Sequence, residues 1–97
     1  MYKKKLDKTM NDFCCSTKGH AYHYEIDDEY ISLYDNGELI FYISFDLINP
    51  DKQKVPYEEL MGFSKKRLIS RDEGVLLDKI WEILGEQLSL EKERRYL

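Results

Sequence analysis

The chain predicts an α+β fold in which a three-stranded antiparallel meander, over about residues 20–46, packs against two C-terminal helices over about 56–69 and 71–90. Two observations predict this class. In the middle of the chain apolar and polar residues alternate, which is the period of a half-buried strand. Towards the C-terminus apolar residues recur every three to four positions, as in an amphipathic helix. A chain of 97 residues is expected to form a single domain over 1–97.

The first 19 residues are predicted to be a polar segment that contains a short helix over about 6–15. Leu6, Met10 and Phe13 stand at i, i+4 and i+7, so they share one helical face. Gly19 is expected to end this segment. Residues 1–5 and 91–97 are expected to fray, as chain ends without apolar anchors do.

Two turns define the predicted meander. Asn36-Gly37 lies between two apolar runs and predicts a two-residue type I′ turn, which places Tyr34 opposite Leu39 and Leu33 opposite Ile40. A second turn is predicted at Asp27-Asp28, which places Tyr24 opposite Ile31. Together the turns place six residues on one face of the sheet: Tyr22, Tyr24, Ile31, Leu33, Ile40 and Tyr42.

The run over 39–45 is apolar on both of its faces in this register. Such a strand is expected to be covered from both sides, either by the N-terminal segment or by another subunit. A homodimeric scaffold, in which this strand pairs or packs with its copy, is therefore one alternative for the role of the protein.

Pro56 and Ser70 mark the predicted starts of the two C-terminal helices. Proline suits the first position of a helix, although Gly62 weakens the helix that would follow. Ser70 and Glu73 form a capping box at the start of the last helix. Five apolar residues form the stripe with which this helix covers the sheet: Leu77, Ile80, Trp81, Leu84 and Leu88.

The charge of the chain is unevenly distributed. The net charge is −4, but residues 20–51 contain eight acidic side chains and no Lys or Arg. Two interpretations are open. The acidic stretch is either neutralised by basic residues of the same chain, such as Lys65, Lys66, Arg67 or the N-terminal lysines, or it is displayed to a basic partner.

Motifs for catalysis and cofactor binding are missing from the sequence. It contains no nucleophile elbow, no glycine-rich phosphate loop and no calcium-loop spacing. The chain is therefore predicted to be neither an enzyme nor a cofactor-binding protein. No stretch approaches the roughly 20 apolar residues that span a bilayer. Direct binding to nucleic acid is disfavoured because the tyrosines lie within the acidic stretch, which repels phosphate.

The two cysteines, Cys14 and Cys15, are neighbours and cannot join distant parts of the chain. Their position favours a reducing, cytoplasmic setting. Together with His20 and His23 they provide nitrogen and sulfur ligands close together in sequence, so a small zinc or thiol site is a second alternative. Against it, neighbouring cysteines make a strained tetrahedral edge, and the two histidines point to opposite faces if they lie on a strand.

The sequence favours a small, acidic, non-catalytic protein-binding module. Its candidate contact residues lie at or beside the two turns: Asp27, Asp28, Glu29, Tyr30, Tyr34, Asp35 and Glu38. Tyrosines surrounded by charge are common in protein interfaces, where the charge selects the partner. Such a module would act as an inhibitor or immunity-type protein that occupies the basic site of a nucleic-acid-handling partner. One alanine and abundant Lys, Ile, Tyr and Glu are typical of AT-rich bacterial or phage genomes.

Overall fold

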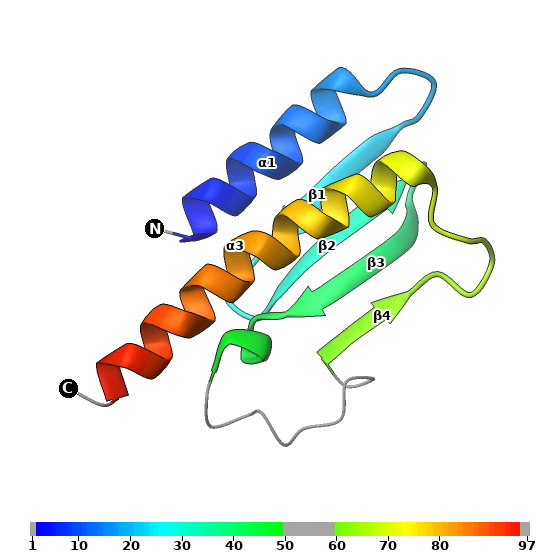
Figure 1. Ribbon diagram of the computed structural model, residues 1–97. Helices are drawn as coiled ribbons and strands as arrows, with labels where there is room; N and C mark the ends of the chain where they lie inside the picture. The colour runs from blue at the N-terminus through cyan, green and yellow to red at the C-terminus, as the bar shows by residue number, and fades with distance from the viewer. Residues whose placement is uncertain (1, 50–59, 96–97) are drawn as a thin grey trace.

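The computed structural model describes residues 2–49 and 60–95 and has the predicted α+β class (Figure 1). Four strands form one antiparallel sheet in the order β1-β2-β3-β4. The elements follow one another as α1 (Tyr2–Ser16), β1 (Tyr22–Ile26), β2 (Tyr30–Asp35), β3 (Glu38–Ser44), the 3-10 helix η1 (Phe45–Ile48), β4 (Met61–Phe63) and α3 (Arg71–Arg95).

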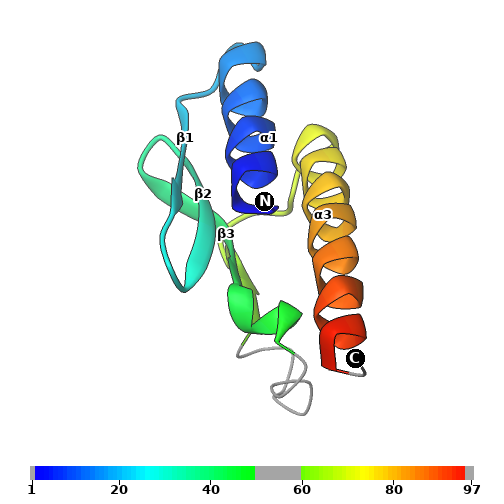
Figure 2. The same cartoon turned by 90° about the vertical axis from the view of Figure 1, so that its left-hand side faces the viewer.

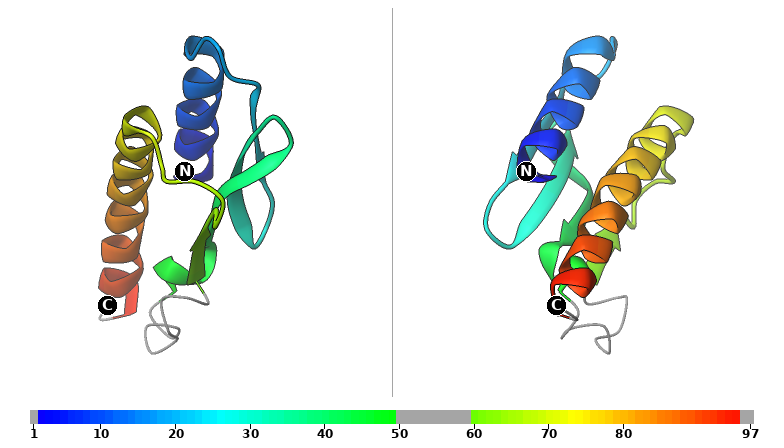
Figure 3. Two further views of the ribbon diagram at one scale, coloured as in Figure 1. Left: turned by 90° about the vertical axis from the view of Figure 1, so that its right-hand side faces the viewer. Right: turned by 60° about the vertical axis from the view of Figure 1, so that its left-hand side comes forward.

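The molecule has two layers, a sheet and a pair of helices (Figure 2). Helices α1 and α3 lie side by side, run in opposite directions and cover the same face of the sheet. Within the described ranges no helix covers the other face, which we call the open face (Figure 3). Neither of these two helices has a stretch apolar enough to cross a lipid bilayer.

Helix α1 is longer than predicted and belongs to the core. It begins at Tyr2, so residues 2–5 are helical rather than frayed. Leu6 and Met10 are completely buried in the same cluster as the central strands, and Phe13 packs against it. The shared apolar face that the spacing predicted is therefore what attaches this helix to the sheet.

The Asn36-Gly37 turn is confirmed. Both residues have positive φ angles, 53° and 80°, as a type I′ turn requires. Tyr34 lies opposite Leu39 as predicted.

A β-bulge immediately after this turn changes the faces of β3. Ile40 is the extra residue, so Leu33 lies opposite Phe41 instead of Ile40. Phe41 and Ile43 therefore point into the core, where both are fully buried. The prediction that Tyr42 shares the core face is wrong. A shift by one residue sends each later side chain to the opposite face, and Tyr42 lies on the open face.

The first turn lies one residue later than predicted. The amide of Asp27 donates to the carbonyl of Tyr30 at 3.0 Å, so the residues of the turn are Asp28 and Glu29. As a result Tyr24 lies opposite Leu33 rather than Ile31. The partner of each β1 residue therefore lies two positions further along β2 than predicted. Because side chains on a strand alternate between the two faces, every β1 side chain stays on its predicted face.

The predicted helix over 56–69 is wrong over 61–69; residues 56–59 lie outside the described residues. Met61–Phe63 form strand β4, which pairs with the edge of β3. Gly62 is a poor helix former, and the free edge of β3 gives this segment backbone hydrogen bonds that outweigh local propensity. β2 and β4 lie on the two sides of β3, so Phe41, Tyr42 and Ile43 already have strand partners on both edges.

Helix α3 starts with the predicted capping box. The amide of Ser70 donates to Glu73 at 3.0 Å, and the amide of Glu73 donates to Ser70 Oγ at 3.3 Å. The stripe facing the sheet is centred on Leu76, Ile80 and Leu84, which are buried. The helix continues to Arg95, beyond the predicted end at residue 90.

Candidate functional site

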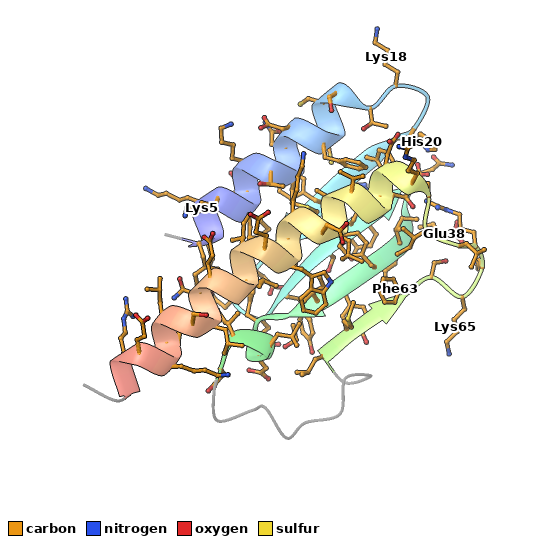
Figure 4. All side chains as sticks on the ribbon, viewed as in Figure 1. Lys5, Lys18, His20, Glu38, Phe63 and Lys65 are labelled. Atoms are coloured by element: carbon orange, nitrogen blue, oxygen red, sulfur yellow. The ribbon has the colours of Figure 1, made fainter. Side chains whose placement is uncertain are left out.

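The acidic side chains of the central stretch lie at opposite ends of the sheet. The β1–β2 turn contains Asp28 and Glu29, whereas Asp35 and Glu38 flank the β2–β3 turn. In Figure 4, His20 and Glu38 mark the second end, close to where α3 begins. The two ends differ in how much of their negative charge the protein itself neutralises.

At the β2–β3 end the carboxylates are engaged by basic side chains of the same chain. Asp35 is only 17% exposed and lies 3.4 Å from the Arg67 guanidinium and 3.0 Å from His20 Nδ1. Glu38 pairs with the Lys66 ammonium at 3.2 Å. Of the two interpretations of the acidic stretch, internal neutralisation therefore applies to this end. Asp35 and Glu38 each have a basic partner within the chain, and the Glu38–Lys66 pair lies on the surface.

An ion cluster around the buried Glu73 explains this neutralisation; it is made of His20, Tyr22, Asp35, Arg67 and Glu73. Glu73 is completely buried and accepts two hydrogen bonds from Arg67, at 2.9 and 2.8 Å, and one from Tyr22 Oη at 2.6 Å. Burial alone would raise the pKa of Glu73, but the hydrogen bonds from Arg67, Tyr22 and the Ser70 amide lower it to about 2. Burial and the bond to Glu73 raise the pKa of Tyr22. Neither group exchanges a proton near neutral pH. The cluster therefore stabilises the fold by connecting β1 and β2 to the start of α3.

At the β1–β2 end the carboxylates stay exposed. Asp27 accepts hydrogen bonds from the amides of Tyr30 and Glu29, each at 2.7 Å, and these bonds lower its pKa. Asp28 is fully exposed, and among residues 2–49 and 60–95 its one ion-pair partner is Lys3, at 3.8 Å. In the described part of the chain Glu25 and Glu29 form no ion pair. Negative charge is therefore held in a defined geometry and remains largely unneutralised here.

Aromatic rings cover the open face next to these carboxylates. His23 stacks on Tyr34 with centroids 4.7 Å apart, and Tyr30 meets Tyr42 edge to face at 5.7 Å. The ring of Tyr42 also lies over Gly62: a β-carbon at residue 62 would collide with that ring. Glycine on β4 is thus what gives the Tyr42 ring room to lie over this strand.

Tyr30 lies where two hollows meet. One, of about 370 Å³, is lined by Glu25, Asp27, Tyr30, Ser32, Tyr34, Leu39 and Tyr42. The other, of about 420 Å³, is lined by Asp28, Glu29, Tyr30, Ser44, Phe45, Asp46 and Asn49. The Tyr30 side chain is 37% exposed between them. We call this region the Tyr30 surface and define it as Glu25, Asp27, Asp28, Glu29, Tyr30, Tyr42 and Asp46.

The structure brings together five of the seven predicted contact residues: Asp27, Asp28, Glu29, Tyr30 and Tyr34. Tyr34 lines the same hollow as Tyr30, and His23 stacks on it. Sequence reasoning missed Glu25, Tyr42 and Asp46. For Tyr42 a signal existed, because it alternates with the apolar residues Phe41 and Ile43, a pattern that would have assigned it to the solvent side of β3.

The alternative metal or thiol site is not assembled. Cys15 is exposed beside Asn11, His20 is bound to Asp35, and His23 stacks on Tyr34. Burial raises the pKa of the Cys14 thiol. Across residues 2–49 and 60–95 no group of three or more His, Cys, Asp or Glu side chains is arranged to hold a metal ion.

No protein-family model, curated protein or solved structure matches this chain. What can be inferred about its function therefore depends on the surface itself. The prominent feature of that surface is an exposed tyrosine surrounded by carboxylates on the open side of a four-stranded sheet.

Proposed function

We propose that this chain is a small, acidic, non-catalytic protein-binding module whose Tyr30 surface docks on a basic patch of a partner protein. One observation carries the proposal: Tyr30 is exposed at the junction of two hollows whose carboxylates are mostly free of ion pairs with the residues that the structure describes. Interfaces often centre on an aromatic side chain surrounded by groups that exclude water. Charge around such an anchor raises the association rate and selects a partner of opposite sign.

The partner we propose is a nucleic-acid-handling protein, which the module inhibits by occupying its basic site. Such sites carry Lys and Arg side chains that bind phosphates. The support comes from the fixed geometry of the acidic turn, where Asp27 holds two backbone amides. A preorganised cluster of carboxylates loses little conformational entropy when it binds. We place the module in the cytoplasm of a bacterial or phage-infected cell, since its two cysteines are free thiols and its composition is that of an AT-rich genome.

The test combines partner capture with charge-reversal variants. Immobilised wild-type protein is exposed to a lysate of its native host, the retained protein is purified, and its binding is measured by calorimetry at low and high salt. We expect a basic partner, with affinity that falls steeply as salt is added. Asp28→Lys/Glu29→Lys and Tyr30→Ala should each weaken binding at least tenfold. The matched control Asp78→Lys/Glu82→Lys makes the same change in charge on the exposed surface of α3 and should bind like the wild type.

A second measurement tests the inhibitory role. The partner's binding to, or cleavage of, a nucleic acid is assayed with increasing amounts of the module, and one equivalent should abolish it. A partner that binds Asp28→Lys/Glu29→Lys as well as the wild type would refute the assignment to the Tyr30 surface. A partner whose nucleic-acid activity is unchanged in the saturated complex would refute the inhibitory role.

A further inference from the structure

Strand β1 forms one edge of the sheet, and its outer side is unpaired by any strand that the structure describes. Two hydrogen bonds show how its backbone is oriented: Asn36 donates to Ala21, and Asp27 donates to Tyr30. Hydrogen-bonded and non-hydrogen-bonded pairs alternate along an antiparallel ladder. The backbone groups of the odd-numbered residues of β1 therefore point to β2, and those of Tyr22, Tyr24 and Ile26 point outward.

This edge has few of the features that usually keep sheet edges apart. Natural edge strands are protected by proline, charged side chains (especially lysine), bulges or very short length. β1 is a five-residue strand, Tyr22–Ile26, with an uninterrupted register and without proline or lysine; it carries one acidic side chain, Glu25. Its outward N–H and C=O groups are ready to accept another strand.

We propose that a second copy of this chain pairs with β1 in antiparallel fashion, about a two-fold axis through Tyr24. The two four-stranded sheets would then join into one sheet of eight strands with a continuous open face. In this register Tyr24 lies opposite Tyr24 of the other copy, and Tyr22 lies opposite Ile26. His23 of each copy lies opposite Glu25 of the other.

The side chains of β1 select this register. His23 and Glu25 are exposed on the open face, and their backbone groups are used by β2. In the new ladder they would form non-hydrogen-bonded pairs, in which cross-strand side chains approach most closely. Because of the two-fold axis, the pair between the His23 imidazole and the Glu25 carboxylate forms twice in each dimer. Sliding the strands by one repeat in either direction would place His23 against His23 or Glu25 against Glu25, which removes the attraction.

The helix side of β1 fits the same arrangement. Tyr24 Oη donates to Asp7 of α1 at 2.7 Å, so the polar end of this side chain is satisfied within its own subunit. Its ring is left to contact the equivalent ring across the axis, and aromatic pairs stabilise adjacent strands. The self-complementarity of the strand under a two-fold axis is the reason to choose a second copy over a foreign peptide as the occupant.

Sedimentation equilibrium of the full chain over a wide range of concentration tests the proposal. The contact is short, so we expect a concentration-dependent equilibrium between monomer and dimer. His23→Glu places Glu against Glu, and Glu25→Lys places Lys against His; each should weaken dimerisation by roughly tenfold. The double variant His23→Glu/Glu25→Lys restores opposite charges across the axis and should restore the wild-type dissociation constant.

A matched control and a folding check keep the outcomes separate. Glu82→Lys makes the same change in charge as Glu25→Lys but lies on the exposed surface of α3, so it should leave dimerisation unchanged. Circular dichroism and thermal unfolding establish that each variant is folded. A wild type that stays monomeric at millimolar concentration would overturn the proposal, as would a dimer that tolerates both single variants. Dimerisation needs no other protein, so its failure would leave the proposed function of the Tyr30 surface untouched.

Discussion

Glu73 is an ionised carboxylate with no solvent exposure, held by a guanidinium, a phenol and a backbone amide. The two hydrogen bonds from Arg67 are charge-assisted and bidentate, which is the strongest arrangement available to this pair of side chains. Desolvation opposes both charges, so the pair contributes little beyond what an apolar pair would. Removing only one of the two charges leaves the other without its partner, and this destabilises the fold.

A double-variant cycle on this pair makes the first prediction. Arg67→Met leaves a buried carboxylate without its cation and should lower the free energy of unfolding by about 3–5 kcal/mol. In Arg67→Met/Glu73→Met both charges are gone, and most of that loss should be recovered. Urea unfolding followed by circular dichroism measures all the variants. A loss in the double variant that equals the sum of the losses in Arg67→Met and Glu73→Met would show that the two side chains act independently.

The second prediction concerns acid. The pKa of Glu73 is about 2 in the folded protein, against an ordinary value of 4.5. The ionised Glu73 therefore contributes about 3 kcal/mol to the free energy of unfolding above about pH 4.5. This contribution is lost as the pH falls towards 2. Other carboxylates also titrate here, so the quantity to measure is the difference between wild type and Glu73→Gln. That difference should shrink as the pH falls from 5 to 2; a constant difference would contradict the assignment.

At the scale of single elements, one inserted residue in β3 and one glycine in β4 shape the open face. The bulge at Ile40 turns Tyr42 outward, and Gly62 gives its ring room to lie across the neighbouring strand. An aromatic side chain that covers a glycine on an adjacent strand stabilises both strands. The Tyr30 surface thus depends on backbone features that lie outside its own turn.

Gly62→Ala makes the third prediction. The new methyl group would meet the Tyr42 ring, which must swing away from β4 and lose its packing. We expect a loss of about 1 kcal/mol in stability. In a Tyr42→Ala background the same change should be neutral or stabilising, because alanine orders a strand better than glycine. Chemical unfolding of the four proteins gives the coupling between the two sites, and additive effects would mean that the ring does not depend on Gly62.

An element could be predicted from the sequence when the interactions that form it join residues close together in the chain. The Asn36-Gly37 hairpin and the Ser70–Glu73 capping box were both predicted correctly, because each depends on residues within three positions of one another. The segment over 61–63 was predicted to be helical and is strand β4, because its partner is β3. The bulge likewise arises from packing: only the assembled core requires both Phe41 and Ile43 to point inward.

At the scale of the whole molecule, α1 is an integral part of the core. Its apolar face carries Leu6 and Met10 into the same cluster as Ile31, Leu33 and Phe41. The segment looks polar in the sequence because its lysines and aspartates occupy the other faces of the helix. The two helices together cover one side of the sheet, which leaves the other side to solvent or to a partner (Figure 2).

The fourth prediction compares two leucines. Leu6→Ala should lower the free energy of unfolding by about 2–5 kcal/mol, because Leu6 is completely buried. Leu68→Ala removes the same atoms from a side chain that is 91% exposed, and should change stability by less than about 0.5 kcal/mol. Thermal unfolding of both variants provides the measurement. A small effect of Leu6→Ala would mean that α1 is dispensable for the fold.

The α+β class, the hairpin, the start of α3 and the apolar face of α1 can be read from the sequence, since each of these depends on periodicity or on contacts between near neighbours. The apolar face of α3 was predicted only in part, because Leu76 was missed. Which carboxylates form ion pairs depends instead on long-range packing. Arg67 meets Asp35 across 32 positions of the chain, and Tyr22 meets Glu73 across 51. Such contacts form when distant segments pack together, and a linear charge pattern holds no information about which basic group each carboxylate will meet. The result is an acidic stretch that is neutralised at one end of the sheet and exposed at the other.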